Sequence, residues 1–333
     1  MVSDVRSPHR PAVTVIVPTR DRWPLLSTHA LPSALGQEAV EVEVIVVDDG
    51  SMDETPERLS ALTDPRLRVV THETARGVAS ARNSGIAAAR GDWIAFHDDD
   101  DLWSPRKLQT QLEGLGAAGW GYASVIVVDH DNRPLYALPL PDPTEVTSGL
   151  MRGNIIPGGP SNVIGRASLV HEVGGFDERL SHSADWDMWI RLARSGQPSV
   201  CTEVLVATLQ HSRRMIFRDQ PDVIREVKTL FAKYDGPSRQ QLRSVAEWLA
   251  FTHHREGHRL RAAGLYLRAA VAYRSPGNLP AAVGALFGEP GLRLASGLLR
   301  GLRGGSHLEH DVLPVPAEPE WLERYRGENG LGP

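Results

Sequence analysis

The sequence predicts an α/β fold, in which a mainly parallel sheet is flanked by helices and followed by a helical C-terminal region. Short β-branched runs alternate with segments of helical periodicity over residues 12–105, as in parallel strands joined by crossover helices. Between about 220 and 300, apolar residues recur at helical spacing without intervening strands. The 333 residues are 41% hydrophobic and 23% charged, which suits a soluble globular protein with one large domain or two ordinary ones.

Each element follows from a local signal. The first strand is a β-branched run that ends at Pro18, and the second ends in two acids and a glycine, VVDDG. Glycines flank the helix GVASARNSGIAAARG. Residues 133–141 return as an antiparallel edge strand or as a loop. We expect strands at 12–18, 40–51, 67–72, 92–98 and 120–129, and helices at 25–37, 55–63, 77–91 and 184–196.

Composition divides the chain into four ranges: a flexible N-terminus at 1–11, an α/β domain at 12–215, a helical region at 216–303, and a Pro- and Gly-rich tail at 304–333. Two outcomes are open for the tail. It either wraps the surface through Trp321, Leu322 and Tyr325 or is disordered.

Charge and composition exclude several classes of protein. A formal net charge of -5 offers no basic excess for phosphates, so we expect no nucleic-acid partner. The single cysteine, Cys201, excludes a disulfide framework and a Cys-rich zinc site. The N-terminus has no apolar signal region and the chain has no long apolar run, so we expect a cytoplasmic protein. The arginine-dotted apolar stretch at 281–304 either lies on a membrane surface or forms a packed helical pair, so membrane contact is at most peripheral. The oligomeric state cannot be read from the sequence.

The turn after the first strand, VPTRDRWPL, contains no G-x-G-x-x-G, and G-x-x-x-x-G-K-[ST] occurs nowhere in the chain. A dinucleotide-binding Rossmann site therefore loses its main support, and a P-loop is excluded. A nucleotide, if one binds, is held in another way.

Four consecutive aspartates, Asp98 to Asp101, follow the predicted strand at 92–98. Side chains of an extended chain alternate, so Asp98 and Asp100 are expected on one side, where they can share a cation. Oxygen ligands of this kind suit Mg²⁺ or Mn²⁺. The alternative is a solvated acidic loop or the N-terminal cap of the next helix.

A second acid pair, Asp48 and Asp49, ends the neighbouring strand, where Asp-Gly-Ser is also an ordinary turn. Arg82 lies on a predicted helix near the same edge and could offset phosphate charge. The alternative for Arg82 is an exposed surface arginine.

The segments VTVIVPTRDR, VEVIVVDDGS, GVASARNSGIAAARGDWIAFHDDDD and ADWDMWIRLA, in this order from about residue 13 to 195, resemble the successive motifs of family 2 glycosyltransferases with the GT-A fold. The resemblance implies a nucleotide-diphospho-sugar transferase-like domain, with a nucleotide-binding half at 12–105 and an acceptor half at 106–215. It also implies roles for eight residues of the donor and cation site. Pro18, Thr19, Arg20 and Asp49 line the nucleoside pocket, Arg82 lies near the diphosphate, Asp98 and Asp100 hold the cation, and Asp99 belongs to the donor site.

The resemblance further identifies Asp185, in SADWDMW, as the general base. Ala184 stands where the family often has Glu, which removes one carboxylate. A base on the face opposite the diphosphate deprotonates the acceptor hydroxyl in a single displacement, so configuration inverts. The alternative is a pair of acids, Asp185 and Asp187, that only stabilises a helix N-terminus.

Other residues complete the expected site. The glycine-rich IPGGPSN is a candidate wall for the acceptor or the donor sugar, or a flexible connector, and His211 is a candidate third metal ligand. The candidate acceptor-side residues are Gly158, Gly159, Ser161, Trp186 and Asp187.

We therefore expect an inverting, Mn²⁺- or Mg²⁺-dependent transfer of sugar from a nucleotide-diphosphate sugar to a hydroxyl on a saccharide, a natural product or a lipid-linked acceptor. Two alternatives are kept. One is a nucleotidyltransferase that uses the same acidic edge, and the other is a non-catalytic nucleotide-sugar-binding or scaffold protein.

Overall fold

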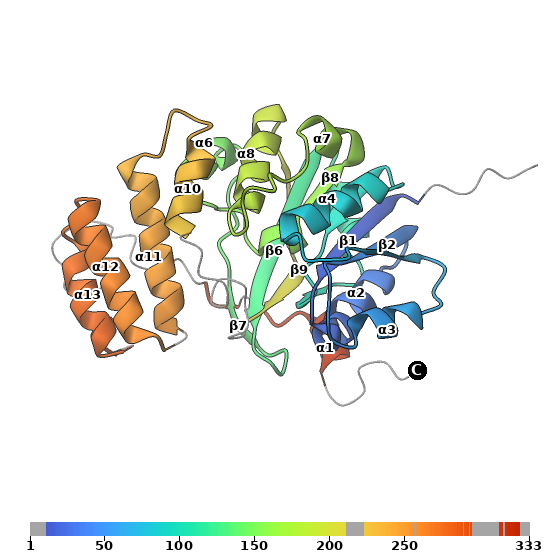
Figure 1. Ribbon diagram of the computed structural model, residues 1–333, viewed down its shortest axis with the longest axis horizontal. Coiled ribbons are helices and arrows are strands. Elements are labelled where there is room, and N and C mark those ends of the chain that lie inside the picture. The colour runs from blue at the N-terminus through green and yellow to red at the C-terminus, as the bar shows by residue number, and fades with distance from the viewer. Residues whose placement is uncertain are drawn as a thin grey trace, which may run out of the picture. The chain divides into compact units, whose positions relative to one another are not determined.

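The computed structural model describes residues 11–210, 223–255, 257–288, 290–292, 294, 313–315 and 317–326 (Figure 1). The chain forms two compact units. Unit 1 comprises Met1–Thr147, Ile155–His211 and Leu313–Pro333, and unit 2 comprises Ser148–Asn154 and Ser212–Val312.

Unit 1 is built on a nine-stranded sheet with the order β3-β2-β1-β4-β8-β6-β9-β5, in which β7 pairs with β6 (Figure 1). Its strands are β1 Val13–Thr19, β2 Val42–Asp48, β3 Leu67–Thr71, β4 Trp93–Phe96, β5 Asp101–Trp103, β6 Trp120–Val128, β7 Pro134–Ala137, β8 Ile164–Arg166 and β9 Ser199–Leu209.

The first four strands run parallel to one another, as the alternation of strands and helices predicted. β8 runs antiparallel to β4 and to β6, so β6 again points in the direction of β4. The carboxyl ends of β1, β2, β4 and β6 therefore point to the same edge of the sheet, which is where an open α/β sheet binds its ligands. The sequence did not predict the two short antiparallel strands β5 and β8.

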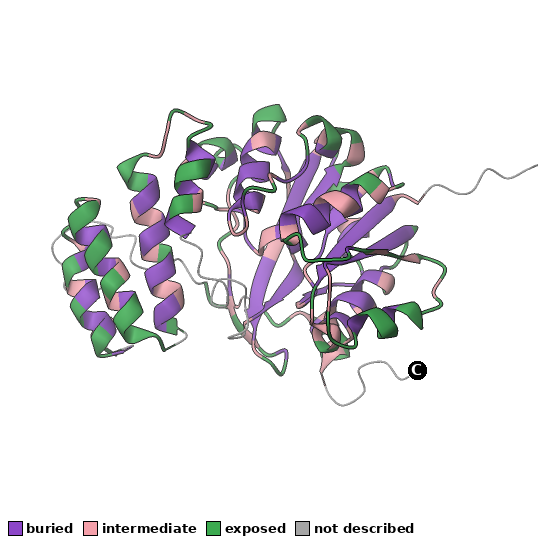
Figure 2. Cartoon of the chain, viewed as in Figure 1, coloured by how far each residue is buried: buried purple, intermediate pink, exposed green. Residues whose placement is uncertain are grey.

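Helices cover both faces of the sheet. Val13, Val15 and Val17 of β1 pack in one cluster with residues of α1 (Trp23–Leu25), the π-helical turn η1 (Leu26–Ala30) and α2 (Leu31–Leu35). On the opposite face Ile16 meets α4 (Val78–Ala88), where a Cβ on Gly85 would collide with the isoleucine. Side chains alternate along a strand, so one apolar run supplies both faces. Burial of whole strands follows (Figure 2). The other helical segments of unit 1 are α3 Thr55–Ser60, α5 Lys107–Gly114, η2 Gly159–Asn162, α7 Ala167–Glu172, α8 Ala184–Ser195 and η3 Glu320–Tyr325.

The last described residues of the chain pack on unit 1. Leu313 forms a bridge with Ala137 at the end of β7, and the Trp321 indole donates to the Val204 carbonyl at 3.0 Å. Leu322 is fully buried in a cluster with residues of β5, β6 and β9. In its described part, this segment therefore wraps the surface through its apolar side chains, which is the first of the two expected alternatives.

Unit 2 contains a set of helices. α6, Val146–Leu150, spans the boundary between the units. The rest are α10 Val223–Phe231, α11 Arg239–Arg255, α12 Arg259–Ala272 and α13 Asn278–Leu286. The core between α11, α12 and α13 is made mostly of alanine. Among the described helices, none is long and apolar enough to cross a membrane.

Candidate active site

The aspartate run does not continue β4 as an extended chain. The strand ends at Phe96, and the backbone then turns, with the Asp101 amide donating to the Asp98 carbonyl at 3.2 Å. Asp101 starts β5, which pairs antiparallel with β9, so the chain must change direction within these residues. The expectation that Asp98 and Asp100 share one side of an extended strand is therefore wrong. The four carboxylates differ in direction because the backbone turns at 98–101, and not because side chains alternate along a strand.

The second and third aspartates of the turn are held by one arginine. The Arg22 guanidinium contacts the Asp99 carboxylate at 2.8 Å and the Asp100 carboxylate at 2.6 Å. Thr19, the last residue of β1, donates its hydroxyl to the second Asp99 oxygen at 2.8 Å. Burial of Asp99 raises the pKa of its carboxyl group to about 7, in spite of the Arg22 charge.

The first and fourth aspartates are held from other elements. Arg82 of α4 contacts the Asp98 carboxylate at 2.6 Å. The Ser161 hydroxyl of η2 accepts from the Asp98 backbone amide at 2.9 Å and donates to the Asp101 carboxylate. Ser161 is fully buried beneath the turn, so in this structure it supports the aspartates and has no surface to offer a substrate.

Asp98 and Asp100 are the two aspartates of the turn that have both exposure and the donor atoms that a hard divalent cation prefers. Their side chains are 30% and 14% exposed, whereas Asp99 and Asp101 are buried. Each carries a positively charged guanidinium on one oxygen, so the turn already accommodates cationic groups. Carboxylate oxygens are the donors that Mg²⁺ and Mn²⁺ prefer. His211, the expected third ligand, lies outside the described residues.

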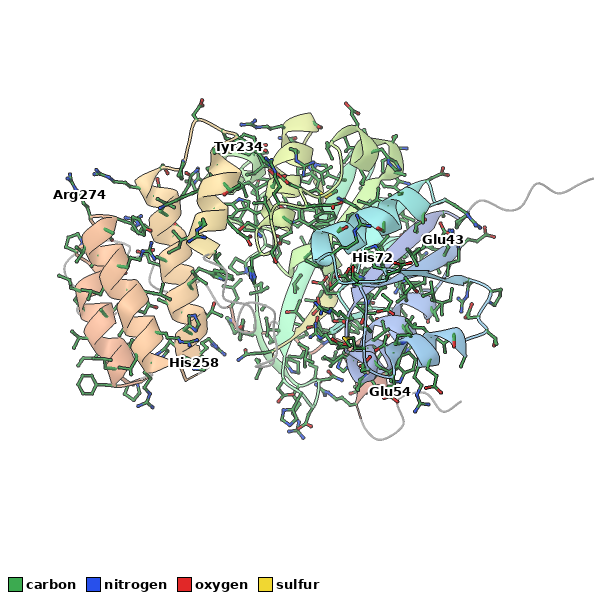
Figure 3. The ribbon with its side chains drawn as sticks, in the orientation of Figure 1. Glu43, Glu54, His72, Tyr234, His258 and Arg274 are labelled. Atoms are coloured by element: carbon green, nitrogen blue, oxygen red, sulfur yellow. The ribbon has the colours of Figure 1, made fainter. Side chains whose placement is uncertain are left out.

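Asp49, expected on the nucleobase, is occupied by the protein itself. Its carboxylate accepts the backbone amides of Arg76 and Gly77, both at 2.8 Å, and one oxygen lies 2.7 Å from His72 Nδ1 (Figure 3 labels His72). Burial alone would raise the pKa of Asp49, but these hydrogen bonds outweigh it and lower the pKa. Asp49 thus anchors the segment after β3, because each of its oxygens already has a donor.

Its neighbour Asp48 carries an oxygen that the expected site did not use. Asp48 is 1% exposed, and Oδ1 accepts the Ser51 amide at 3.0 Å. Oδ2 is buried and has no hydrogen-bond partner in the described structure. A buried acceptor of this kind is costly unless a donor meets it, so Asp48 is the acid of this pair with an oxygen to offer.

The remaining residues of the expected nucleoside pocket lie at the end of β1. Pro18 is buried and opposes Val47 in the sheet, so it lies beside β2. Thr19 is buried with its hydroxyl on Asp99. Arg20 is exposed, and its guanidinium is 3.7 Å from the Asp21 carboxylate. Pro18 and Thr19 therefore shape the edge, and Arg20 is the residue whose side chain reaches solvent.

Asp185 is the second residue of α8, and its side chain is half-buried. Its Oδ1 accepts the Trp186 amide at 2.7 Å, and a Cβ built on Gly159 would lie 3.9 Å from Oδ2. Gly158 and Gly159 both have positive φ angles, 69° and 57°, which favour glycine at both positions. The glycine-rich segment is therefore a defined turn into η2 that lies against the expected base.

Asp187 and Trp186 are buried, and they contribute to packing in this structure. Asp187 is fully buried with its carboxylate on Arg191 at 2.7 Å, and the same arginine donates to the Val173 and Gly175 carbonyls. A buried carboxylate needs such a partner, which explains why Asp187 points away from solvent. Trp186 is 4% exposed, so neither side chain presents a surface to an acceptor.

Sequence reasoning missed Arg22 as a member of the site. It belongs to VPTRDRWPL, a turn that the sequence marked only as lacking a phosphate loop. A basic residue three positions after a strand end, facing an acid run at the end of the adjacent strand, is the signal that could have identified it. The pairing of β1 with β4 brings the two ends together.

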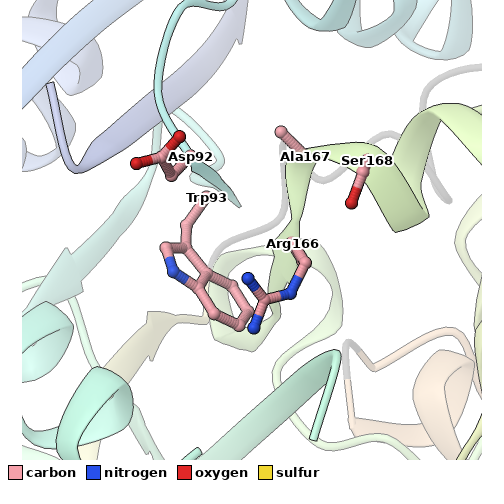
Figure 4. Close-up of a pocket in the computed structure, with 5 residues that line it drawn as sticks. All are labelled: Asp92, Trp93, Arg166, Ala167 and Ser168. Carbon is pink, nitrogen blue, oxygen red and sulfur yellow. The ribbon is translucent and has the colours of Figure 1, made fainter. Parts of the chain in front are cut away.

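Two other features of unit 1 lie elsewhere. Asp129, His130 and Asp131 form a group of potential metal ligands within 4.8 Å, in the exposed β6–β7 turn. A pocket of about 390 Å³ is lined by Asp92, Trp93, Arg166, Ala167 and Ser168 (Figure 4). Trp93 begins β4 and opposes Arg166, so this pocket lies at the end of β4 away from the aspartate turn.

Comparison with known proteins is consistent with this geometry. Residues 14–172 match the family model of glycosyl transferase family 2. The succinoglycan biosynthesis protein ExoO of Rhizobium meliloti is 44% identical over 108 residues, which cover 32% of this chain and 31% of ExoO. The putative colanic acid biosynthesis glycosyl transferase WcaA of Escherichia coli is 28% identical over 200 residues, 57% of this chain and 69% of WcaA. The matched region thus spans less than a third of ExoO.

Similar solved structures share the fold. S. aureus TarS 1-349 in complex with UDP-GlcNAc superposes with a TM-score of 0.56 at 18% identity, over 82% of this chain and 80% of that TarS fragment. The mannosyltransferase PcManGT from Pyrobaculum calidifontis, in complex with GDP-Man and Mn²⁺, has a TM-score of 0.51 at 23% identity, over 89% and 82%. The expected GT-A fold is therefore confirmed.

Proposed function

Since residues 14–172 of this chain match the glycosyl transferase family 2 model, we propose that it transfers a sugar from a nucleotide-diphosphate donor to an acceptor hydroxyl. The reaction inverts the anomeric carbon and uses Mn²⁺ or Mg²⁺. The acceptor is a saccharide, a natural product or a lipid-linked alcohol. The likeness to GT-A proteins solved with UDP-GlcNAc and with GDP-Man and Mn²⁺ supports this class of donor and cofactor.

One observation carries the proposal. The short turn η2 lies next to both the expected base and the expected cation ligands. Gly159 lies against Asp185, and the Ser161 hydroxyl accepts the backbone amide of Asp98. The residue proposed as the base and the acids proposed to bind the cation thus both lie beside this short turn. Transfer of a sugar needs this arrangement, since the hydroxyl must lose its proton close to where the diphosphate leaves.

The residues then take distinct roles. Asp185 accepts the proton of the acceptor hydroxyl as that oxygen attacks the anomeric carbon. Asp98 and Asp100 would hold the cation, which supplies Lewis-acid neutralisation of the leaving diphosphate. Arg82 and Arg22 add fixed positive charge at the same turn, where a departing phosphate group develops negative charge.

On the donor side, the exposed Arg20 is the group whose side chain can reach a nucleotide near the ends of β1 and β2, and the unpartnered Asp48 Oδ2 is buried at the end of β2. Asp49 acts through the backbone that it holds, because its oxygens already accept from Arg76, Gly77 and His72. Gly159, which has no side chain, leaves room beside Asp185 for the sugar or the acceptor, whereas Gly158 packs closely against Val125.

The first experiment is calorimetric titration with UDP, GDP, dTDP and ADP, each with and without Mn²⁺. The protein is then incubated with nucleotide-diphosphate sugars that contain the nucleotide found to bind. We expect cation-dependent binding of one diphosphate, and turnover that releases this diphosphate. Release of pyrophosphate from a nucleoside triphosphate would instead indicate nucleotidyl transfer. Binding without turnover of any sugar would support the non-catalytic alternative.

A further inference from the structure

The outer helices of unit 2 expose large apolar side chains. Their exposed fractions run from 43% at Leu286 to 81% at Leu260. The exposed apolar residues of this surface, here called the α12–α13 surface, are Leu260, Leu267, Val271, Leu279, Val283, Leu286 and Phe287. Figure 2 shows the exposed stretches along both helices.

The spacing of these apolar residues places them along one side of each helix. On α12, Leu260, Leu267 and Val271 follow one another by seven and four residues, which keeps them on one side of the helix. On α13, Leu279 and Val283 are four apart, and Leu286 and Phe287 continue the same side. Each helix therefore presents an apolar face away from its partner.

The burial pattern is the reverse of that of an ordinary surface helix. The helices bury small residues against each other and expose large ones, whereas a helix in water usually buries leucine and phenylalanine. Besides Tyr266 and the polar Asn278, the buried side chains of this helix pair are Ala262, Ala269, Ala270, Ala281, Ala282 and Ala285. Contiguous exposed apolar area of this kind marks a surface that meets something other than water.

The charge of this region identifies the occupant. Among the described residues from 257 onward to 294 there are four arginines, all exposed, and no acid. These are Arg259, Arg261, Arg268 and Arg274, and Figure 3 labels Arg274 near one end of α12. Over residues 257–303 the full sequence has seven arginines and one glutamate, in a chain of net charge -5. This range is therefore strongly basic within an acidic chain, because its arginines are almost unopposed by acids.

We propose that the α12–α13 surface binds an anionic lipid bilayer at the level of the head groups. Leucine, valine and phenylalanine side chains enter the boundary between head groups and acyl chains, and the arginines remain at the phosphates. Arg261 and Arg268 are seven residues apart and directly follow Leu260 and Leu267, so charge and apolar area lie together along α12. A second copy fits less well, because a symmetric interface would set these arginines near those of its partner. The inference does not depend on the proposed enzymatic activity.

The test is co-sedimentation of the full chain with vesicles of phosphatidylglycerol and phosphatidylcholine, and with vesicles of phosphatidylcholine alone. We expect binding to the anionic vesicles that weakens as salt is raised. The double variant Arg261→Gln/Arg268→Gln should bind about 25-fold more weakly, at about fivefold for each arginine. The double variant Val283→Glu/Phe287→Glu should lose binding by about tenfold or more.

Met52→Glu is the matched control, because Met52 is an equally exposed apolar residue of unit 1, 92% exposed. It should bind as the wild type does, and circular dichroism should show every variant folded. No binding to anionic vesicles, or binding that both double variants retain, would overturn the proposal. Sedimentation velocity separates the other occupants in that case. A dimer lost in Val283→Glu/Phe287→Glu would identify a second copy, and a monomer destabilised by this variant would show that the chain covers its own face.

Discussion

Two turns of unit 1 carry aspartates in nearly the same pattern, one at Asp98–Asp101 and the other at Asp129–Asp131, and each follows a strand. In the first, the carboxylates are held by Arg22, Arg82 and Ser161 from three other elements. In the second, Asp129 accepts the amides of Asp131 and Arg133, both at 2.9 Å, so its contacts are local. The same residue type thus builds a tertiary site in one turn and an exposed turn in the other.

The difference follows from where each strand ends. β4 lies inside the sheet between β1 and β8, so its carboxyl end is surrounded by neighbouring strand ends and their helices. The β6–β7 turn closes a hairpin at the end of the sheet, and its acids find their partners within the turn itself, in backbone amides and in Arg133. An acid cluster therefore indicates chemistry only when the sheet surrounds it with groups from distant parts of the chain.

The largest effect should come from the base itself. Asp185→Asn keeps the shape of the side chain but cannot accept a proton, so kcat should fall by about 10²- to 10⁴-fold. Asp131→Asn, in the exposed turn, should leave kcat unchanged. Steady-state release of the nucleoside diphosphate measures both. An Asp185→Asn enzyme with wild-type kcat would rule out this residue as the base.

The second test concerns the cation. Asp100→Ala should abolish the rise in thermal stability that Mn²⁺ gives the protein with its nucleoside diphosphate, because a ligand lost from the folded state no longer stabilises it. Asp131→Ala should retain the Mn²⁺ effect. Thermal unfolding with and without Mn²⁺ decides between the turns. If instead Asp131→Ala lost the effect and Asp100→Ala kept it, the exposed turn would be the metal site.

The third test compares two ion pairs. Arg22 contacts the buried Asp99, so Arg22→Ala leaves a poorly compensated acid and should lower the free energy of unfolding by about 3 kcal/mol. Arg133 pairs with Asp131 at 3.1 Å with both side chains well exposed, so Arg133→Ala should cost about 0.5 kcal/mol or less. Urea unfolding measures both losses. Equal losses would contradict the distinction between a tertiary and a local acid group.

The smallest effect concerns pH. Hydrogen bonds from Arg76, His72 and Gly77 lower the pKa of Asp49 below its ordinary value, so the folded state binds its proton less tightly than the unfolded state. The resulting stability is present above the unfolded pKa, about 3.9, and is lost as pH falls through the lower folded value.

Asp49→Asn should therefore cost about 1–2 kcal/mol at pH 7, and the gap to wild type should narrow below about pH 4. Asp129→Asn removes only local contacts and should cost less at pH 7. Urea unfolding across this pH range measures both gaps. A gap for Asp49→Asn that widens on acidification would show the opposite sign of linkage.

Much of the sheet was readable from local pattern. The runs that became β1, β2, β4 and β6 are β-branched and bounded by turn residues, and the segment at 184–196 has helical apolar spacing. β8 and β5 were missed because three-residue strands carry too few positions for periodicity. Their existence depends on pairing with β4, β6 and β9, which are distant in the sequence.

The candidate site shows the same division. The sequence identified Asp98, Asp100 and Arg82 because acids at a strand end and a nearby helix are local signals. It placed Asp49 in the nucleoside pocket and gave no role to Asp48, whose Oδ2 has no hydrogen-bond partner among the described residues. Adjacent acids cannot be distinguished in a sequence, because their hydrogen-bond donors come from elsewhere in the chain.

By itself, then, the sequence determined the alternation of strands and helices, the edge at which the acids gather, and the resemblance to family 2 glycosyltransferases. Only the tertiary structure decided which carboxylate pairs with which arginine, that Arg22 belongs to the aspartate turn, and that Ser161 and Asp187 are buried. The physical reason is range. Periodicity and turn chemistry act over a few residues, whereas a buried charge is stabilised by whichever partner the fold brings within about 3 Å. In the aspartate turn these partners are 16 residues away for Arg82 and Asp98, 60 for Ser161 and Asp101, and 78 for Arg22 and Asp100.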